Sequence, residues 1–280
     1  MNVTVIGGGT MGNGIAHVFA QHGHAVTLVD VAPERLDAAL QTIGANLGRQ
    51  VKKETLTEAE RDATLGRIRT ETDLATGVSE ADLVVEAATE NPALKAQIFR
   101  TIDGAAPVGA ILASNTSSIS ITEIGGATGR PDRVIGMHFF NPVPVMKLVE
   151  VVRSLATSDE TYETIRALSE MLGKVPVEVN DAPGFVSNRV LMPMINEAIF
   201  CVHEGVATPQ AVDDVMKLGM AHPMGPLALA DFIGLDVCLA IMEVLHREIG
   251  DSKYRPCPLL RKMVAAGHLG RKSGKGFYSY

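Results

Sequence analysis

The chain has 280 residues, of which 46% are hydrophobic and 20% charged, and its formal net charge is −7. This length suits one large domain or two ordinary ones, each with a substantial core. The acidic balance argues against general binding to nucleic acid or to a membrane surface, and no apolar run reaches the roughly 18 residues that a membrane span needs.

The first 60 residues begin with the pattern of one βαβ unit. Residues 3–6 predict a short buried strand, residues 14–20 a helix, and residues 25–29 the next strand. A long polar helix is predicted over residues 33–53, and Thr57 starts a second helix with the pattern of a capping box. We expect these two helices to form a hairpin that stands off the sheet.

Strand and helix patterns then alternate along the chain. Such alternation predicts a doubly wound, mostly parallel sheet. The further predicted strands are residues 68–71, 83–86, 111–114, 134–137, 148–152 and 176–179, and the predicted helices between them are 93–103, 119–124 and 159–172.

The character of the sequence changes at the segment NDAPG, residues 180–184. We expect a Rossmann-type α/β domain over residues 1–182, with the helical hairpin as an insertion, and a smaller all-helical domain over residues 183–280. Beyond the boundary there is no convincing strand before the end of the chain. The predicted helices there are residues 185–203, 211–218, 226–249 and 259–266.

Gly7-Gly8-Gly9-Thr10-Met11-Gly12 is a G-x-G-x-x-G sequence that follows a predicted strand and opens a helix. The glycines permit a tight turn, a close approach to a pyrophosphate and close packing of helix on strand. Asp30 ends the second strand, where a carboxylate can hold the ribose hydroxyls. The pattern predicts a dinucleotide site, with a plain glycine turn as the alternative. Asp30 favours NAD because it repels the 2′-phosphate of NADP, while nearby Arg35 keeps NADP open.

Seven further motifs carry a family resemblance. They are VEAATEN (85–91), SNTSS (114–118), GMHFFNP (136–142), KLVEV (147–151), DAPGFVSNR (181–189), HPMGP (222–226) and GKGFY (274–278). Together with the glycine fingerprint and Asp30, they resemble the L-3-hydroxyacyl-CoA dehydrogenase family, and most closely its short bacterial members, the 3-hydroxybutyryl-CoA dehydrogenases. The HFFNP and PGF-x-x-NR blocks are far more specific than the glycine fingerprint.

The resemblance implies an oxidoreductase that uses NAD to oxidise an (S)-3-hydroxyacyl-CoA to the 3-oxoacyl-CoA, and that runs the reverse reaction. It covers nearly the whole chain, residues 3–278. Since no hydratase domain is attached, we expect a short acyl group, as in 3-hydroxybutyryl-CoA and acetoacetyl-CoA.

The apolar run at residues 134–152 contains a candidate base. Loss of the alcohol proton needs a base that titrates near the operating pH, as histidine side chains generally do, and His138 is the histidine in this run. It ends a predicted strand, and ligands of such sheets bind outside the carboxyl ends of strands. If Pro142 and Pro144 turn the chain back, Glu150 would meet the ring and orient it. On the residues alone, a core histidine near a glutamate remains the alternative; in the resembled family the matching pair is catalytic.

The resemblance assigns further contacts. Asn188 matches an asparagine near the reacting carbon of the substrate, although a neighbouring backbone carbonyl is an alternative partner for a buried amide. Ser117 matches a serine that touches substrate and cofactor, with N-capping of a helix ahead of Ile119 as the alternative. Lys95, which could equally be a solvated helix residue, belongs to the implied cofactor site. The other implied cofactor residues are Glu90, Asn115, Asn141 and Lys272.

Coenzyme A carries phosphates, and cations gather at the end of the predicted helix 33–53. By resemblance Lys53 and Asn46 contact CoA there. Arg49 and Lys52 stand beside them. The alternative is that these cations only complement the helix dipole.

The expected partners and location follow from composition and resemblance. Apolar faces such as residues 227–230 should be covered by a second subunit, and the resemblance implies a homodimer. The N-terminus has no basic region typical of a signal peptide. No cluster has metal-ligand spacing, and the three cysteines form no C-x-x-C pair, so we expect no metal site and free thiols in a cytoplasmic protein. These cysteines are Cys201, Cys238 and Cys257.

Two other functions remain open. One is a dehydrogenase of a free hydroxy acid, in which the basic cluster at residues 49–53 would have no role in substrate binding. The other is a non-catalytic NAD-binding sensor or structural protein, which would not need His138.

Overall fold

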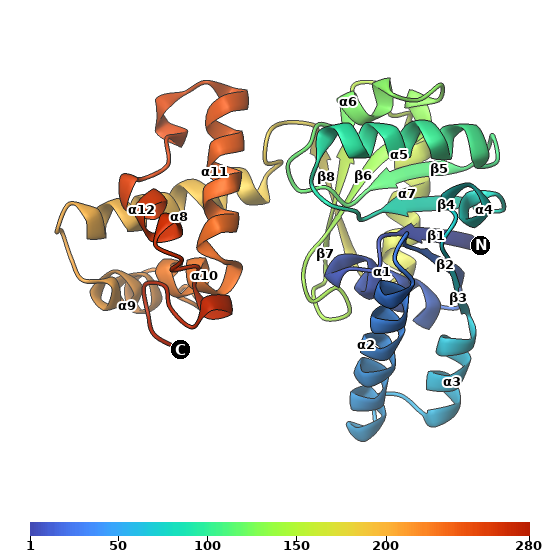
Figure 1. Ribbon diagram of the computed structural model, residues 1–280, viewed down its shortest axis with the longest axis horizontal. Helices are drawn as coiled ribbons and strands as arrows, with labels where there is room; N and C mark the ends of the chain where they lie inside the picture. Colours follow the sequence, from blue (N-terminus) through green and yellow to red (C-terminus); the bar gives the residue numbers. More distant parts are fainter. The chain divides into compact units, whose positions relative to one another are not determined.

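The computed structural model describes residues 1–280. The chain divides into two compact units, Met1–Asp181 and Ala182–Tyr280. The first contains one eight-stranded sheet, whereas the second is helical and has only two isolated β-bridges, near its end (Figure 1). The predicted fold class is confirmed. None of the helices has the length and apolar character needed to cross a membrane.

The sheet has the strand order β3-β2-β1-β4-β5-β6-β7-β8. All neighbouring strands are parallel except β6 and β7, which pair antiparallel. The order changes direction at β1, so the crevice for a ligand is expected beyond the carboxyl ends of β1 and β4. The strands are β1 (Asn2–Ile6), β2 (Ala25–Val29), β3 (Ile68–Glu71), β4 (Leu83–Glu86), β5 (Ile111–Ser114), β6 (Val134–Phe139), β7 (Leu148–Arg153) and β8 (Val175–Asn180).

Helices cover both faces of this sheet (Figure 1). Alternate residues of β1 divide between the faces: Val3 and Val5 join the core under α1, α2 and α7, while the Thr4 hydroxyl donates to Gly77 O of α4. The helices of the first face are α1 (Thr10–Gln21), α2 (Pro33–Lys52) and α7 (Asp159–Met171), and those of the second are α4 (Leu74–Val78), α5 (Pro92–Ala105) and α6 (Ile121–Gly126).

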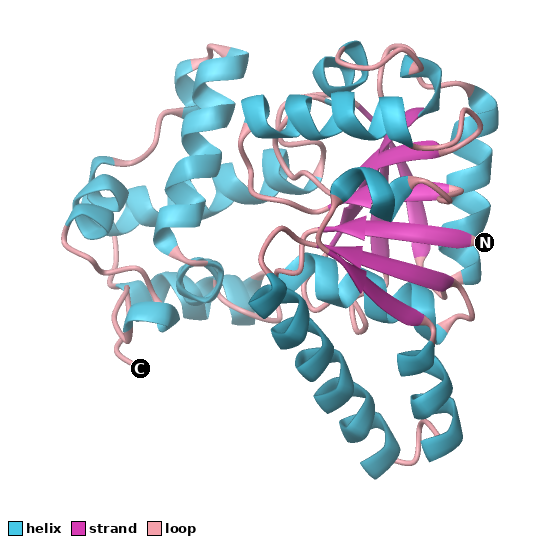
Figure 2. Cartoon of the chain, turned by 45° about the vertical axis from the view of Figure 1, so that its right-hand side comes forward, coloured by secondary structure: helices cyan, strands magenta, loops and turns pink.

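Helices α2 and α3 (Glu58–Gly66) form the predicted hairpin, which extends beyond the sheet (Figure 2). The apolar stripe of α2, with Leu36, Ile43 and Leu47, is buried at one side of the sheet core. Thr57 caps α3 through a full capping box, because its side chain accepts from Glu60 N while the Glu60 carboxylate accepts from Thr57 N.

The helical unit packs around α8, and its core includes Met192, Ile199, Leu227 and Leu245. The prediction of one helix over residues 226–249 is wrong. The chain leaves one helix and enters the next at Gly234, whose φ of 105° is not helical. Glycine adopts this backbone conformation readily, whereas L-residues rarely do. The helices are α8 (Ser187–His203), α9 (Pro209–Gly219), α10 (Pro226–Ile233), α11 (Leu235–Ile249) and α12 (Pro258–Ala265).

Candidate active site

The glycine fingerprint joins β1 to α1 in a backbone conformation that requires glycine. Gly7 has φ 104°, and a Cβ there would lie 2.7 Å from Ala87 O. A Cβ on Gly12 would lie 1.7 Å from Gly7 O, which no side chain can tolerate. The turn therefore brings bare backbone to the start of α1, where amide groups favour an anion such as a pyrophosphate. These residues fit a dinucleotide.

Asp30 follows β2 and is buried beside this turn. Its Oδ2 accepts from Gly8 N at 2.8 Å, and its Oδ1 accepts from Ala32 N at 3.1 Å. The carboxylate therefore holds the glycine turn against the end of β2 as well as presenting a negative charge where the ribose of a dinucleotide binds in this fold.

His138 and Glu150 lie opposite each other in the antiparallel pair β6–β7. The His138 ring Nδ1 is 2.7 Å from Glu150 Oε2, and the two residues are 7% and 2% exposed. An ionised carboxylate only accepts hydrogen bonds, so Nδ1 donates and the lone pair of the neutral ring stays on Nε2. The Phe140 ring packs on the imidazole with a centroid distance of 4.6 Å. This arrangement can act as an oriented general base.

A buried ion pair lies at the carboxyl ends of β4 and β5. Lys95 Nζ is 2.7 and 2.9 Å from the two carboxylate oxygens of Glu86, and these residues are 1% and 0% exposed. Glu86 also accepts from Ser114 Oγ and from Ala88 N, both at 2.7 Å. Lys95 is therefore no solvated helix residue. Glu86 was not among the predicted site residues, although a glutamate at the end of a buried strand already indicates a buried charge that needs a partner.

Glu90 organises the loop after β5. Its carboxylate accepts from Ser117 N at 2.7 Å, from Ser117 Oγ at 3.2 Å and from Thr116 Oγ1 at 2.8 Å. Lys95 Nζ is 3.7 Å from the same carboxylate. The helix that follows is capped by Ser120, whose side chain accepts from Glu123 N, and not by Ser117. The capping alternative for Ser117 is therefore wrong.

Two predicted cofactor residues flank the end of β6. Asn115 is buried, and its Oδ1 accepts from Phe139 N at 2.9 Å, which ties the loop after β5 to the strand that carries His138. Asn141 follows β6 at the surface and forms a cis peptide bond with Pro142.

The predicted CoA contacts lie at the far end of α2. Lys53 is the exposed C-cap residue of α2, and Arg49 and Lys52 stand in its last turn. Arg49 Nη2 donates to Asn46 Oδ1. The end of α2 therefore combines three cations and an amide on one accessible segment.

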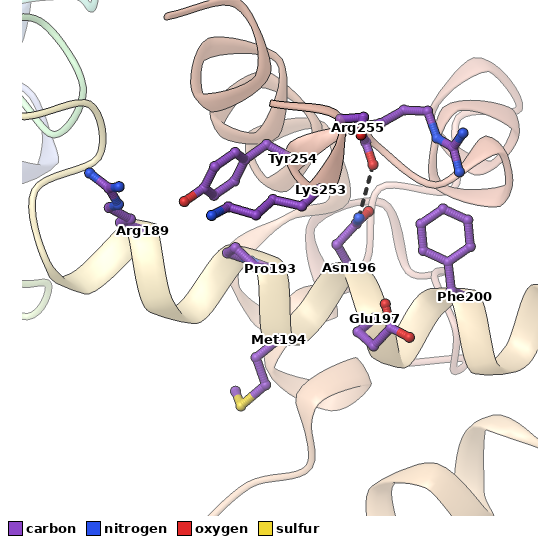
Figure 3. A pocket seen from close by; sticks show the side chains of 10 residues that line it. Arg189, Pro193, Met194, Asn196, Glu197, Phe200, Lys253, Tyr254 and Arg255 are labelled. Carbon is purple, nitrogen blue, oxygen red and sulfur yellow. Dashed lines mark hydrogen bonds between the residues drawn. The ribbon is translucent and has the colours of Figure 1, made fainter. Parts of the chain in front are cut away.

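The remaining predicted residues belong to the helical unit. Asn188 lies in the first turn of α8, and Lys272 pairs with Asp236 at 2.5 Å. A separate cleft of about 570 Å³ lies between α8 and the segment around Tyr254, and none of the predicted site residues lines it (Figure 3). Asn196 inside this cleft donates to Arg255 O at 3.0 Å, as Figure 3 shows, and supports the fold of the helical unit.

The model of the 3-hydroxyacyl-CoA dehydrogenase NAD-binding domain matches residues 2–182, and the model of the 3-hydroxyacyl-CoA dehydrogenase C-terminal domain matches residues 184–280. The chain belongs to the 3-hydroxyacyl-CoA dehydrogenase family. It is therefore an oxidoreductase with an NAD-binding domain, and the predicted family and enzyme class are confirmed.

Individual relatives within the 3-hydroxyacyl-CoA dehydrogenase family agree. A probable 3-hydroxybutyryl-CoA dehydrogenase of Bacillus subtilis is 60% identical, over 99% of this chain and 96% of that protein. The human mitochondrial hydroxyacyl-coenzyme A dehydrogenase is 45% identical, over 100% of this chain and 91% of that protein. The crystal structure of the (S)-3-hydroxybutyryl-CoA dehydrogenase from Ralstonia eutropha superposes with a TM-score of 0.97 at 53% identity, covering 100% of this chain and 98% of that chain.

Proposed function

We propose that the protein is an NAD-dependent (S)-3-hydroxyacyl-CoA dehydrogenase that interconverts 3-hydroxybutyryl-CoA and acetoacetyl-CoA. The relatives from Bacillus subtilis and Ralstonia eutropha carry names that specify this four-carbon acyl group. The observation that carries the chemistry is the buried hydrogen bond between His138 and Glu150, at the carboxyl end of β6 in a nucleotide-binding sheet.

Proton transfer is carried out by His138 with the help of Glu150. His138 Nε2 takes the hydroxyl proton of the substrate as C3 is oxidised, and returns it in the reverse direction. Glu150 keeps Nδ1 protonated and stabilises the imidazolium once it forms. Asn188 donates to the substrate oxygen, where negative charge gathers as the carbonyl is reduced, and Ser117 contacts the substrate beside it. NAD⁺, when bound, accepts the hydride from C3.

The cofactor preference is for NAD over NADP. The Asp30 carboxylate, held by Gly8 N and Ala32 N, repels a 2′-phosphate and accepts from ribose hydroxyls. The cofactor's pyrophosphate would be held by the fingerprint residues Gly7, Gly9, Thr10, Met11 and Gly12. The other residues of this proposed cofactor site are Glu90, Lys95, Asn115, Ser117, Asn141 and Lys272.

The CoA moiety binds at the end of α2. Lys53, the exposed C-cap residue, attracts its phosphates, and Asn46 and Ser117 make polar contacts. Arg49, which donates to Asn46, adds a second cation beside it.

The helical unit, Ala182–Tyr280, closes over the substrate and forms a homodimer. Large apolar side chains stand exposed on it, among them Val190, Leu218 and Phe232. Several large apolar side chains exposed on one unit are typical of a surface that a partner covers. Sedimentation of the purified protein at micromolar concentration tests this, and a monomer would contradict it.

The enzyme assay follows absorbance at 340 nm with acetoacetyl-CoA, and compares NADH with NADPH side by side. We expect turnover with acetoacetyl-CoA, a preference for NADH, and loss of turnover in His138→Ala. Retained turnover in that variant would contradict the proposed mechanism.

The substrate class is tested separately with Lys53→Glu. This variant should raise KM for the CoA ester about tenfold, because it places a like charge beside the CoA phosphates. The matched control is Lys262→Glu, an exposed lysine on α12, which should leave KM unchanged. An unchanged KM in Lys53→Glu, or equal turnover of free acetoacetate, would favour a free hydroxy acid as substrate.

A further inference from the structure

Lys174 is a buried cation that the proposed chemistry does not use. It stands just before β8 and is 8% exposed. Its backbone N donates to Ser169 O of α7 at 3.0 Å, and the next residue, Val175, donates to Lys147 O at 2.7 Å. The backbone on both sides of Lys174 is thereby anchored, and its side chain is directed toward the loop between β6 and β7, residues 140–147.

The ammonium group of Lys174 binds this loop through backbone carbonyls. Nζ donates to Val143 O at 2.5 Å and to Met146 O at 2.8 Å. Burial lowers the pKa of Lys174, and carbonyl oxygens rather than a carboxylate surround the charge. A buried charge is costly unless its hydrogen bonds are made, and hydrogen bonds from a charged donor are stronger than neutral ones. The position of the loop is therefore strongly coupled to Lys174.

The opposite side of the loop rests on the nucleotide-binding helix. A Cβ on Gly14 of α1 would lie 2.9 Å from Val143 Cβ, so the loop packs on α1 where only a glycine leaves room for it. Inside the loop, Val145 N and Met146 N both donate to Pro142 O at 2.9 Å. The loop is thus held between α1 and the Lys174 ammonium group.

This loop begins with two residues of the candidate site. Phe140 packs on the His138 ring, and Asn141 belongs to the proposed cofactor site. The His138–Glu150 hydrogen bond itself is fixed by the pairing of β6 with β7, not by the loop. Lys174 therefore acts on two residues near the imidazole: Phe140, whose ring packs on it, and Asn141, which we assign to the cofactor site.

We propose that Lys174 is a positioning residue for hydride transfer: its two hydrogen bonds to Val143 O and Met146 O set the place of Phe140 and Asn141 relative to His138. This inference rests on the proposed function. A displacement of about 1 Å at a reacting centre reduces turnover by about 100-fold, so loosening of the loop should reduce kcat more than cofactor affinity.

The test compares Lys174→Met with Lys174→Arg and with Leu168→Ala, which truncates a buried apolar side chain on α7 and removes no hydrogen bond to the loop. Lys174→Met keeps the length of the side chain but donates no hydrogen bond. We expect kcat for acetoacetyl-CoA to fall about 10- to 100-fold, with the Kd of NADH, measured by its fluorescence, within about twofold. We also expect a larger deuterium isotope effect on kcat with NADH labelled at the transferred position. Lys174→Arg, which keeps a charged donor, should recover part of kcat.

Leu168→Ala should lower Tm and leave both kcat and the isotope effect unchanged. If Lys174→Met does not fold, Gly14→Ala provides the second variant, because its Cβ pushes Val143 from the other side and should lower kcat in the same way. Wild-type kcat in the folded Lys174→Met or Gly14→Ala protein would overturn the inference. So would equal loss of activity in Lys174→Met and Leu168→Ala at matched Tm.

A readout that needs no turnover separates this inference from the proposed function. Amide hydrogen exchange at Val145 and Met146 should be faster in Lys174→Met than in the unaltered protein. Absence of turnover in the unaltered protein would contradict the proposed function. Unchanged exchange at these two amides would contradict the coupling of the loop to Lys174.

Discussion

Lys95→Met is expected to destabilise the sheet unit strongly, because it leaves the buried Glu86 carboxylate without its cation. Both carboxylate oxygens lie within 2.9 Å of Lys95 Nζ. Removal of one partner of a buried ion pair costs about 3–5 kcal/mol. Ser114 Oγ and Ala88 N continue to donate to the carboxylate, so we expect the lower half of this range, about 3–4 kcal/mol.

The assay is urea unfolding at pH 7 followed by far-ultraviolet circular dichroism, since the chain has no tryptophan for fluorescence. The double variant Lys95→Met/Glu86→Gln, which removes both charges, should be more stable at pH 7 than Lys95→Met alone. Lys52→Met, an exposed lysine on α2, is the matched control and should stay within about 0.5 kcal/mol of the unaltered protein. A Lys95→Met protein within about 1 kcal/mol of the unaltered protein at pH 7 would refute this reasoning.

Three further predictions concern single residues. Glu150→Gln should lower kcat about 10²- to 10⁴-fold in the 340 nm assay, because a neutral amide cannot stabilise the imidazolium of His138; a loss below threefold would contradict this. Asp30→Ala should narrow the preference for NADH over NADPH by about tenfold, measured as the ratio of kcat/KM, and an unchanged ratio would show that Asp30 does not select the cofactor. Burial lowers the pKa of His17 from 6.5 to about 4, so the unfolded chain binds the proton more tightly. The contribution of neutral, buried His17 to the free energy of unfolding is therefore complete above pH 6.5. About 3 kcal/mol of it is lost as the pH falls from 6.5 to 4. In urea unfolding, the free energy of unfolding of His17→Gln should depend less on pH than that of the unaltered protein. An equal slope against pH in the two proteins would contradict this.

Local patterns were enough to predict most of the fold. Strands such as Ile111–Ser114 are short apolar runs between turns, and such runs mark fully buried strands of a parallel sheet. An ambiguous local pattern led to the wrong prediction of a single helix over residues 226–249. Gly234 could have continued a helix, and only its φ of 105° separates α10 from α11. The five-residue helix α4 was not predicted, because it depends on the Asp73 cap and on Gly77 packing against Val29.

The site residues that could be predicted from the sequence are those whose position follows from the end of a strand. The position of His138 at the end of a strand followed from sequence, and its contact with Glu150 needed only a turn that reversed the chain. The partners of Lys95 did not follow, because burial of a helix lysine depends on where α5 crosses the end of β4. The roles of these residues in catalysis remain predictions. So do the contacts of Asn188, since resemblance alone assigns them.

The reversal of direction at β7 explains how His138 and Glu150 come together so close in the chain. A parallel neighbour needs a crossover of a dozen or more residues, usually a helix, as α5 provides between β4 and β5. Only residues 140–147 join β6 to β7, so β7 must run antiparallel. Directly opposed residues of such a pair present their side chains on the same face, and a register shift of one residue would turn Glu150 to the other face. The position of this short loop, which Lys174 binds through Val143 O and Met146 O, therefore affects the surroundings of His138 directly.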